Sequence, residues 1–131
     1  MSGPIVVDAS AALEILLPGS TGDRARAEIR GNRLAAPAHL DAEVLSALTR
    51  RSRAGDLSVD QVDTALARLA AAPIRRYPLQ ALLIEAWAMR ANIAARDALY
   101  VALARMLVAR LLTADVRLSR APRLGVSVTT V

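Results

Sequence analysis

Four acidic residues stand where an apolar segment ends or a helix begins, and their types and spacing could do chemistry. They are Asp8, Glu43, Asp97 and Asp115. An isolated carboxylate beside a buried segment is costly, because the charged group loses its hydration. If the four carboxylates converge, a cation relieves their repulsion, and an oxygen-only ligand set suits Mg²⁺ or Mn²⁺. The pattern therefore indicates metal-dependent phosphoryl chemistry.

Short predicted strands alternate with predicted helices, and these elements must position the acids. The strands are expected at residues 5–7, 34–36, 74–77, 111–114 and 126–130. The helices are expected at residues 9–17, 22–30, 40–54, 59–71, 79–90, 97–109 and 116–121. Such alternation is typical of a parallel sheet covered on both faces, which binds ligands at the carboxyl ends of its strands. Asp8 and Asp115 each follow a strand, so we expect them on the same edge.

Local signals refine the helices. Ser20 or Thr21 could cap the helix at 22–30, and Ser58 with Gln61 forms a capping-box pattern at the start of the helix at 59–71. In the helix at 79–90, the spacing predicts one apolar face, made of Leu79, Leu82, Leu83, Ala86 and Trp87.

Each acid also has a structural explanation. Asp8 could cap the helix that follows it, although Ser10 could cap that helix instead and leave the Asp8 carboxylate free. Glu43 could stabilise a helix dipole from the first turn. Asp97 and Asp115 could do either. Position at the edge of the sheet favours a functional role for Asp8. For the other three acids, a functional role depends on whether the four side chains lie close together in the fold.

Two polar residues close in sequence to these acids also have more than one possible role. Thr113 could orient a carboxylate or bind a ligand water, or it could be an ordinary strand threonine. His39, the one histidine, cannot build a histidine-rich metal site, and we expect it at the surface or near a helix cap rather than as a ligand.

Composition excludes several classes of protein. The chain has 131 residues, which is the size of one domain with its own core. It has no cysteine, so neither a disulfide framework nor a thiolate zinc site is possible. It has no lysine, which excludes P-loop nucleotide hydrolases and the lysine-dependent phosphatases and receiver domains. With no phenylalanine and few other aromatics, it lacks a base-stacking platform for single strands.

Charge suggests a polyanionic partner. All 17 basic residues are arginine, and the net charge is +5. The planar arginine fork matches phosphate geometry, although coding bias in a GC-rich genome is an equal explanation for the missing lysine. Asp8 interrupts the apolar start of the chain, so this start does not resemble a signal peptide, and no uncharged run is long enough to span a bilayer. We therefore expect a cytoplasmic protein without membrane contact.

Four segments, in order along the chain, carry a resemblance to a known family. They are VVDASA at 6–11, DAEVLSAL at 41–48, RDALYVALA at 96–104 and LLTADVRL at 111–118. They resemble the four motif blocks of PIN-domain ribonucleases, and most of all those of the VapC toxins of bacterial toxin–antitoxin pairs. The resemblance covers nearly the whole chain.

This resemblance implies a single PIN domain over residues 1–131, folded as a three-layer α/β/α sandwich with a central, mostly parallel sheet. It implies Mg²⁺- or Mn²⁺-dependent endonucleolytic cleavage of RNA, often tRNA or ribosomal RNA. It also implies a homodimer and a cognate VapB-type antitoxin whose C-terminal tail blocks the acidic pocket.

The resemblance also implies roles for residues. Matching positions make Asp8, Glu43, Asp97 and Asp115 the catalytic and metal-binding cluster, with Asp8 and Asp97 most often assigned as direct ligands. Ser10 and Thr113 match polar positions that support the acids.

Arginines depart from the family pattern at two positions. Arg96 stands beside the third acid, where it could contact RNA or pair with an acid when no metal is bound, and Arg117 stands where many PIN nucleases carry a further acid. Two alternative functions stay open. One is an RNA- or protein-binding module on a degenerate PIN fold, and the other is a housekeeping PIN nuclease in RNA maturation.

Overall fold

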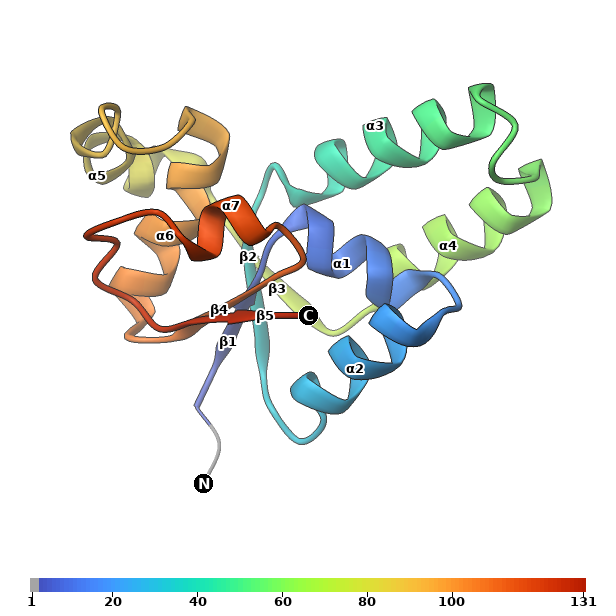
Figure 1. Ribbon diagram of the computed structural model, residues 1–131, viewed down its shortest axis with the longest axis horizontal. Helices are drawn as coiled ribbons and strands as arrows, with labels where there is room; N and C mark the ends of the chain where they lie inside the picture. The colour runs from blue at the N-terminus through green and yellow to red at the C-terminus, as the bar shows by residue number, and fades with distance from the viewer. Residues whose placement is uncertain (1–2) are drawn as a thin grey trace.

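Five short strands pair in parallel and form one sheet (Figure 1). The computed structural model describes residues 3–131. The strands are β1 (Ile5–Val7), β2 (Leu34–Pro37), β3 (Ile74–Tyr77), β4 (Arg110–Thr113) and β5 (Val128–Thr130), in the order β3-β2-β1-β4-β5. The central strand β1 is a β-branched run, and all of its residues are buried, as expected for a strand covered on both faces.

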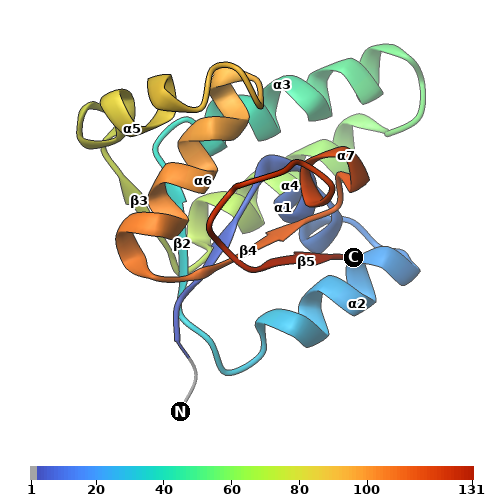
Figure 2. The same cartoon turned by 60° about the vertical axis from the view of Figure 1, so that its left-hand side comes forward.

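Helices cover both faces of this sheet. They are α1 (Ala9–Leu16), α2 (Ser20–Ile29), α3 (Leu40–Arg53), α4 (Val59–Ala71), α5 (Leu83–Ala88), α6 (Ala95–Leu107) and α7 (Val116–Ser119), with a 3₁₀ turn, η1 (Leu79–Leu82), before α5. Helices α1 to α4 lie on one side, and α5 and α6 lie on the other (Figures 1 and 2). The expected three-layer α/β/α sandwich is therefore confirmed.

The helices nearest the acids are held by apolar rows. In α3, Leu40, Val44 and Leu48 recur every four residues and are fully buried. In α6, the run from Tyr100 to Ala104 is buried throughout. These rows fix the two helices that carry Glu43 and Asp97.

Two local expectations are wrong. Helix α2 begins at Ser20, and its N-cap is Gly19, which makes no side-chain cap and adopts a φ of 144° that favours glycine. The predicted caps, Ser20 and Thr21, therefore lie inside the helix. The apolar face predicted for the helix at 79–90 is wrong in part, because Leu82 and Ala86 are buried but Leu83 and Trp87 are 56% and 68% exposed.

The capping box is confirmed. The Ser58 hydroxyl accepts from the Gln61 backbone N–H at 3.1 Å, and the Gln61 side chain accepts from the Ser58 backbone N–H at 2.8 Å. None of the helices in the described part of the chain has the length and apolarity needed to cross a bilayer.

Candidate active site

A pocket of about 310 Å³ lies where the sheet meets α1, α3 and α6, and all four predicted acids line it. The residues around it are Asp8, Ala9, Ser10, Leu13, Glu43, Ala47, Arg50, Arg51, Arg96, Asp97, Tyr100 and Asp115. Asp8 and Asp115 follow the carboxyl ends of β1 and β4, which are neighbours in the sheet. Parallel topology thus brings together acids that are 107 positions apart in the sequence (115 − 8).

Asp8 is buried, with 4% of its surface exposed, and both of its carboxylate oxygens accept hydrogen bonds. Oδ1 accepts from the Ser10 hydroxyl at 2.6 Å and from the Ala11 N–H at 2.9 Å, and Oδ2 accepts from the Thr113 hydroxyl at 2.5 Å. Asp8 is therefore itself the N-cap of α1, and the idea that Ser10 caps the helix in its place is wrong. Burial raises the pKa of Asp8 despite these three donors.

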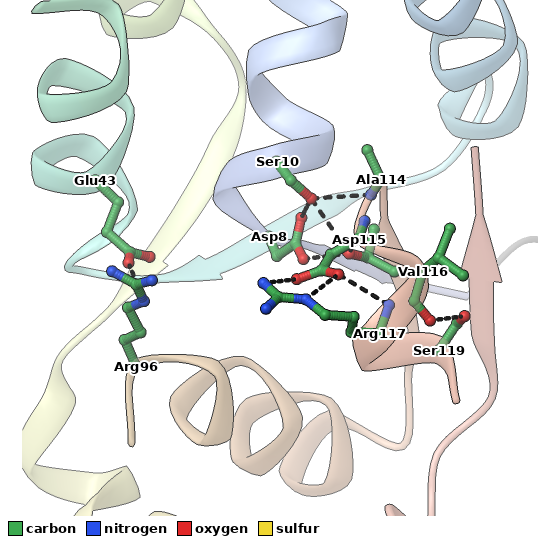
Figure 3. Close-up of polar contacts among 10 residues, drawn as sticks. Asp8, Ser10, Glu43, Arg96, Ala114, Asp115, Val116, Arg117 and Ser119 are labelled. Atoms are coloured by element: carbon green, nitrogen blue, oxygen red, sulfur yellow. Dashed lines mark hydrogen bonds and ion pairs between the residues drawn. The ribbon is translucent and has the colours of Figure 1, made fainter. Parts of the chain in front are cut away.

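Ser10, in the first turn of α1, and Thr113, at the end of β4, also contact the backbone that follows β4. The Ser10 hydroxyl accepts from the Ala114 N–H, and the Thr113 hydroxyl accepts from the Asp115 N–H, both at 2.9 Å (Figure 3). The same two hydroxyls thus contact the Asp8 carboxylate and the backbone beside Asp115.

Asp115 caps α7, since its Oδ1 accepts from the Arg117 N–H at 2.9 Å. The Arg117 guanidinium lies 3.4 Å from Asp115 Oδ2. Burial acts to raise the pKa of Asp115, but the hydrogen bonds and the charge of Arg117 outweigh it and hold this pKa below its usual value.

Asp97 and Glu43 face the pocket from two helices. Helix α6 begins at Ala95, two residues earlier than expected, so Asp97 lies in its first turn and does not cap it. Burial raises the pKa of Asp97; Arg96 opposes this effect, and the charges of Asp115 and Glu43 add to it. Burial thus disfavours the charged form of both Asp8 and Asp97.

The acids line one pocket without forming a closed set of metal ligands. Within residues 3–131, no three acidic or histidine side chains lie close enough together to hold a metal ion. In Figure 3, Glu43 and Arg96 lie on one side, and Asp8, Asp115 and Arg117 lie on the other. The available donors are nonetheless carboxylate oxygens, which are the ligands that Mg²⁺ and Mn²⁺ prefer.

Three arginines contribute positive charge to the wall of the pocket. Arg50 and Arg51 come from α3, and Arg96 comes from the start of α6 with its Nε 3.9 Å from Glu43 Oε2. An arginine beside an acidic pocket can bind a phosphate while the acids bind a cation. The arrangement suits a polyanionic substrate that a metal ion bridges to the protein.

Sequence reasoning missed the role of one residue of this region, Tyr100. Tyr100, treated only as one of few aromatics, donates from its hydroxyl to Glu43 Oε1 at 2.5 Å. Its position three residues after Asp97 was the available signal, because residues three apart share a helix face. His39 was expected at the surface or near a helix cap, and it does stand at the N-cap position of α3, although it makes no side-chain capping bond and its side chain is only 14% exposed.

Comparisons with known proteins point to one family. The PIN domain family matches residues 5–124. The chain is 48% identical to Ribonuclease VapC3 of Mycobacterium tuberculosis over 120 residues, which is 89% of this chain and 86% of that protein. It is 43% identical to Ribonuclease VapC9 of the same species over 115 residues, or 88% of each chain.

Solved structures show the same fold. The VapC20 toxin of Mycobacterium tuberculosis, described as cleaving the sarcin–ricin loop, matches with a TM-score of 0.66 at 18% identity, over 88% of this chain and 92% of that one. VapBC2 from Rickettsia felis, bound to a promoter DNA fragment, matches with a TM-score of 0.67 at 12% identity, over 97% and 98% of the two chains.

Proposed function

This chain belongs to the PIN-domain family and, within it, to the VapC ribonucleases, and we propose that it is a metal-dependent endoribonuclease toxin of a VapBC-type pair. The observation that carries this proposal is the convergence of Asp8, Glu43, Asp97 and Asp115 on one arginine-lined pocket. The reaction is hydrolysis of RNA phosphodiester bonds, with tRNA or ribosomal RNA as the expected substrate class.

The residues that line the pocket would have different roles in this reaction. Asp8 and Asp97 would hold the Mg²⁺ or Mn²⁺ ion directly, since burial disfavours their charged forms and a bound cation would offset that cost, and Glu43 and Asp115 would complete the acidic cluster. A bound ion polarises the scissile phosphate and activates water. Ser10 and Thr113 orient the Asp8 carboxylate through their hydroxyls.

Besides contributing to the acidic cluster that would hold the ion, Glu43 is the residue we assign to the attacking water, which it orients or deprotonates. It stands apart from Asp8 and Asp115 across the pocket (Figure 3). Arg50, Arg51 and Arg96 would hold the RNA backbone beside it. In-line attack by water leaves a 5′-phosphate and a 3′-hydroxyl.

The proposal includes three statements about biological context. The partner is a cognate VapB-type antitoxin whose C-terminal tail enters the acidic pocket, and the cytoplasm is the compartment where cellular RNA would be cleaved. The toxin acts as a homodimer. Leu83, Ile84 and Trp87 on α5, which are 56%, 88% and 68% exposed, support a protein partner, because exposed apolar groups of this size are costly in water. Light scattering that shows a stable monomer would contradict the dimer.

The test is cleavage of total RNA by wild-type protein and by Asp8→Asn, each with Mg²⁺, Mn²⁺ or EDTA. Asn preserves the helix cap, so the variant is expected to fold while losing a metal ligand. We expect discrete fragments from the wild type with metal only, and at least about 100-fold slower cleavage by Asp8→Asn, because even outer ligand partners cost about 10- to 100-fold.

Asp63→Asn is the matched control, since Asp63 is exposed on α4 and does not line the pocket. It should cleave like the wild type. Full metal-dependent cleavage by Asp8→Asn would contradict the assignment. The binding module would be favoured if the wild type neither cleaved RNA nor bound a divalent metal ion, and if Asp97→Ala bound RNA as tightly as the wild type. A housekeeping nuclease would lack a neighbouring antitoxin gene and would not arrest growth when expressed.

A further inference from the structure

Three side chains connect α3 to α6 beside the pocket. The Tyr100 hydroxyl donates to Glu43 Oε1 at 2.5 Å, and the His39 ring packs on the Tyr100 ring with centroids 4.6 Å apart and planes tilted by 39°. His39 Nε2 lies 3.1 Å from the carbonyl oxygen of Arg96, the residue directly before Asp97. The cluster therefore joins the helix of Glu43 to the backbone beside Asp97.

Tyr100 is a permanent donor to Glu43. Only 1% of its surface is exposed, and burial together with the hydrogen bond to Glu43 raises the pKa of Tyr100 far above its usual value. A neutral hydroxyl that donates to a carboxylate forms a short, charge-assisted bond. The hydrogen bond thereby commits Glu43 Oε1 to Tyr100.

His39 is fixed from two sides. A carbonyl oxygen only accepts hydrogen bonds, so Nε2 carries the hydrogen that it donates to Arg96, and the same N–H lies 3.4 Å from Glu43 Oε1. Its Nδ1 is buried with no hydrogen-bond partner in the described part of the chain. A buried polar atom without a partner is costly and needs an explanation. The contacts of Nε2 and the ring supply one, since they dictate where the ring must lie.

We propose that Tyr100 and His39 are positioning residues that set the Glu43 carboxylate relative to Asp97. They hold Oε1 and leave Oε2 as the oxygen that Glu43 offers to the pocket. Within residues 3–131, Oε2 forms one ion pair, with Arg96 Nε at 3.9 Å, and the Arg96 side chain is 73% exposed. This inference rests on the proposed function, because it assumes that the acids bind a metal.

A purely structural role is the competing explanation, since a buried tyrosine hydroxyl needs some partner and Glu43 supplies one. The two explanations differ in what Tyr100→Phe changes. A structural hydroxyl affects only stability, whereas a positioning hydroxyl affects metal affinity and acts solely through Glu43.

The experiment measures Mn²⁺ binding by calorimetry to wild type, Tyr100→Phe, Glu43→Gln and the double variant. Tyr100→Phe retains the ring that packs on His39, and thermal unfolding without metal checks the fold. We expect Tyr100→Phe to weaken Mn²⁺ binding about 10- to 100-fold, as other outer partners of metal ligands do. In the Glu43→Gln background, the same change should cause no further loss.

Tyr77→Phe is the matched control, because Tyr77 lies on β3 and does not line this pocket. It should bind Mn²⁺ like the wild type. His39→Gln, which retains an N–H donor, should bind more tightly than His39→Leu, which has none.

The outcomes separate this inference from the proposed function. If Tyr100→Phe binds Mn²⁺ like the wild type while Glu43→Gln binds weakly, the positioning role is wrong and the proposed function stands. If Tyr100→Phe weakens binding equally with and without Glu43, Tyr100 does not act through Glu43, and the inference is again wrong. If the wild type binds no Mn²⁺, the proposed function and this inference both fail.

Discussion

At the scale of single residues, folding shifts the pKa values of two acids in the pocket in opposite directions. Folding raises the pKa of Asp97, mainly through burial, and leaves Asp115 with a lowered pKa beside Arg117. A carboxyl group with a raised pKa favours folding in its protonated form. Its stabilising contribution is fully present below the unfolded pKa, near 4, and is lost as the pH rises through the folded pKa. For Asp115 the sign is opposite, and stability is lost as the pH falls.

Asp97→Asn should therefore stabilise the metal-free protein at pH 7, because it removes a carboxylate whose charge folding penalises. Asp115→Asn should destabilise it, since it removes a favourable pair. A difference of one pKa unit between folded and unfolded states corresponds to about 1.4 kcal/mol. Thermal unfolding in EDTA between pH 4 and pH 7 measures the stability of both variants. A melting temperature of Asp97→Asn below that of the wild type at pH 7 would contradict the idea that folding penalises the Asp97 charge.

The effect of added metal on the melting temperature is a second test of the charge in the pocket. Mn²⁺ should raise the melting temperature of the wild type at pH 7, because a ligand that binds only the folded state stabilises it by mass action. Asp8→Asn should lose most of this increase. The same thermal scans with and without Mn²⁺ measure it, and an equal increase in both proteins would show that Asp8 does not hold the ion.

At the scale of elements, the contact between α1 and α2 depends on a glycine. A Cβ on Gly22 would lie 2.4 Å from the carbonyl oxygen of Glu14 and 2.8 Å from that of Leu17. Both are backbone atoms at the end of α1, so a larger residue requires the two helices to separate. Helix α1 is also the helix that Asp8 caps.

Gly22→Ala should therefore destabilise the protein. Overpacking costs about 1–3 kcal/mol, and the higher helix propensity of alanine offsets up to about 1 kcal/mol of that cost. Urea unfolding measures this change. Gly3→Ala is the control, because nothing lies within 4 Å of a Cβ at that position. A Gly22→Ala variant more stable than the wild type would show that α1 and α2 separate easily.

The sequence predicted elements better than contacts. Strands and helices were readable because apolar periodicity and glycine or proline punctuation are local signals, and every predicted strand is present. The roles of His39 and Tyr100 were not readable, because their interaction depends on packing between α3 and α6, 61 positions apart (100 − 39). The exposure of Trp87 was missed because periodicity cannot tell a short helix at the surface from one against the core.

At the scale of the whole molecule, the net charge of +5 combines with arginines at the acidic pocket to favour RNA. Binding should weaken steeply with salt, because each neutralised phosphate releases counterions. Arg51→Gln should reduce the slope of log K against log salt by about 0.7–0.9. Arg24→Gln, on α2 and outside the pocket lining, should leave the slope unchanged. Filter binding of RNA in EDTA at several salt concentrations measures both slopes, and equal slopes for Arg51→Gln and wild type would remove Arg51 from the interface.

The pairing of β1 with β4 has a consequence for the order of events during synthesis. Residues 5–7 pair with residues 110–112, so the central strand lacks one neighbour until most of the chain has been made. Contacts this distant in sequence form late in folding, since the intervening chain must first be ordered. Thr113 and Asp115 reach the pocket only with that strand. The candidate pocket is thus incomplete on a growing chain, and its full lining is assembled only after nearly all of the polypeptide has been translated.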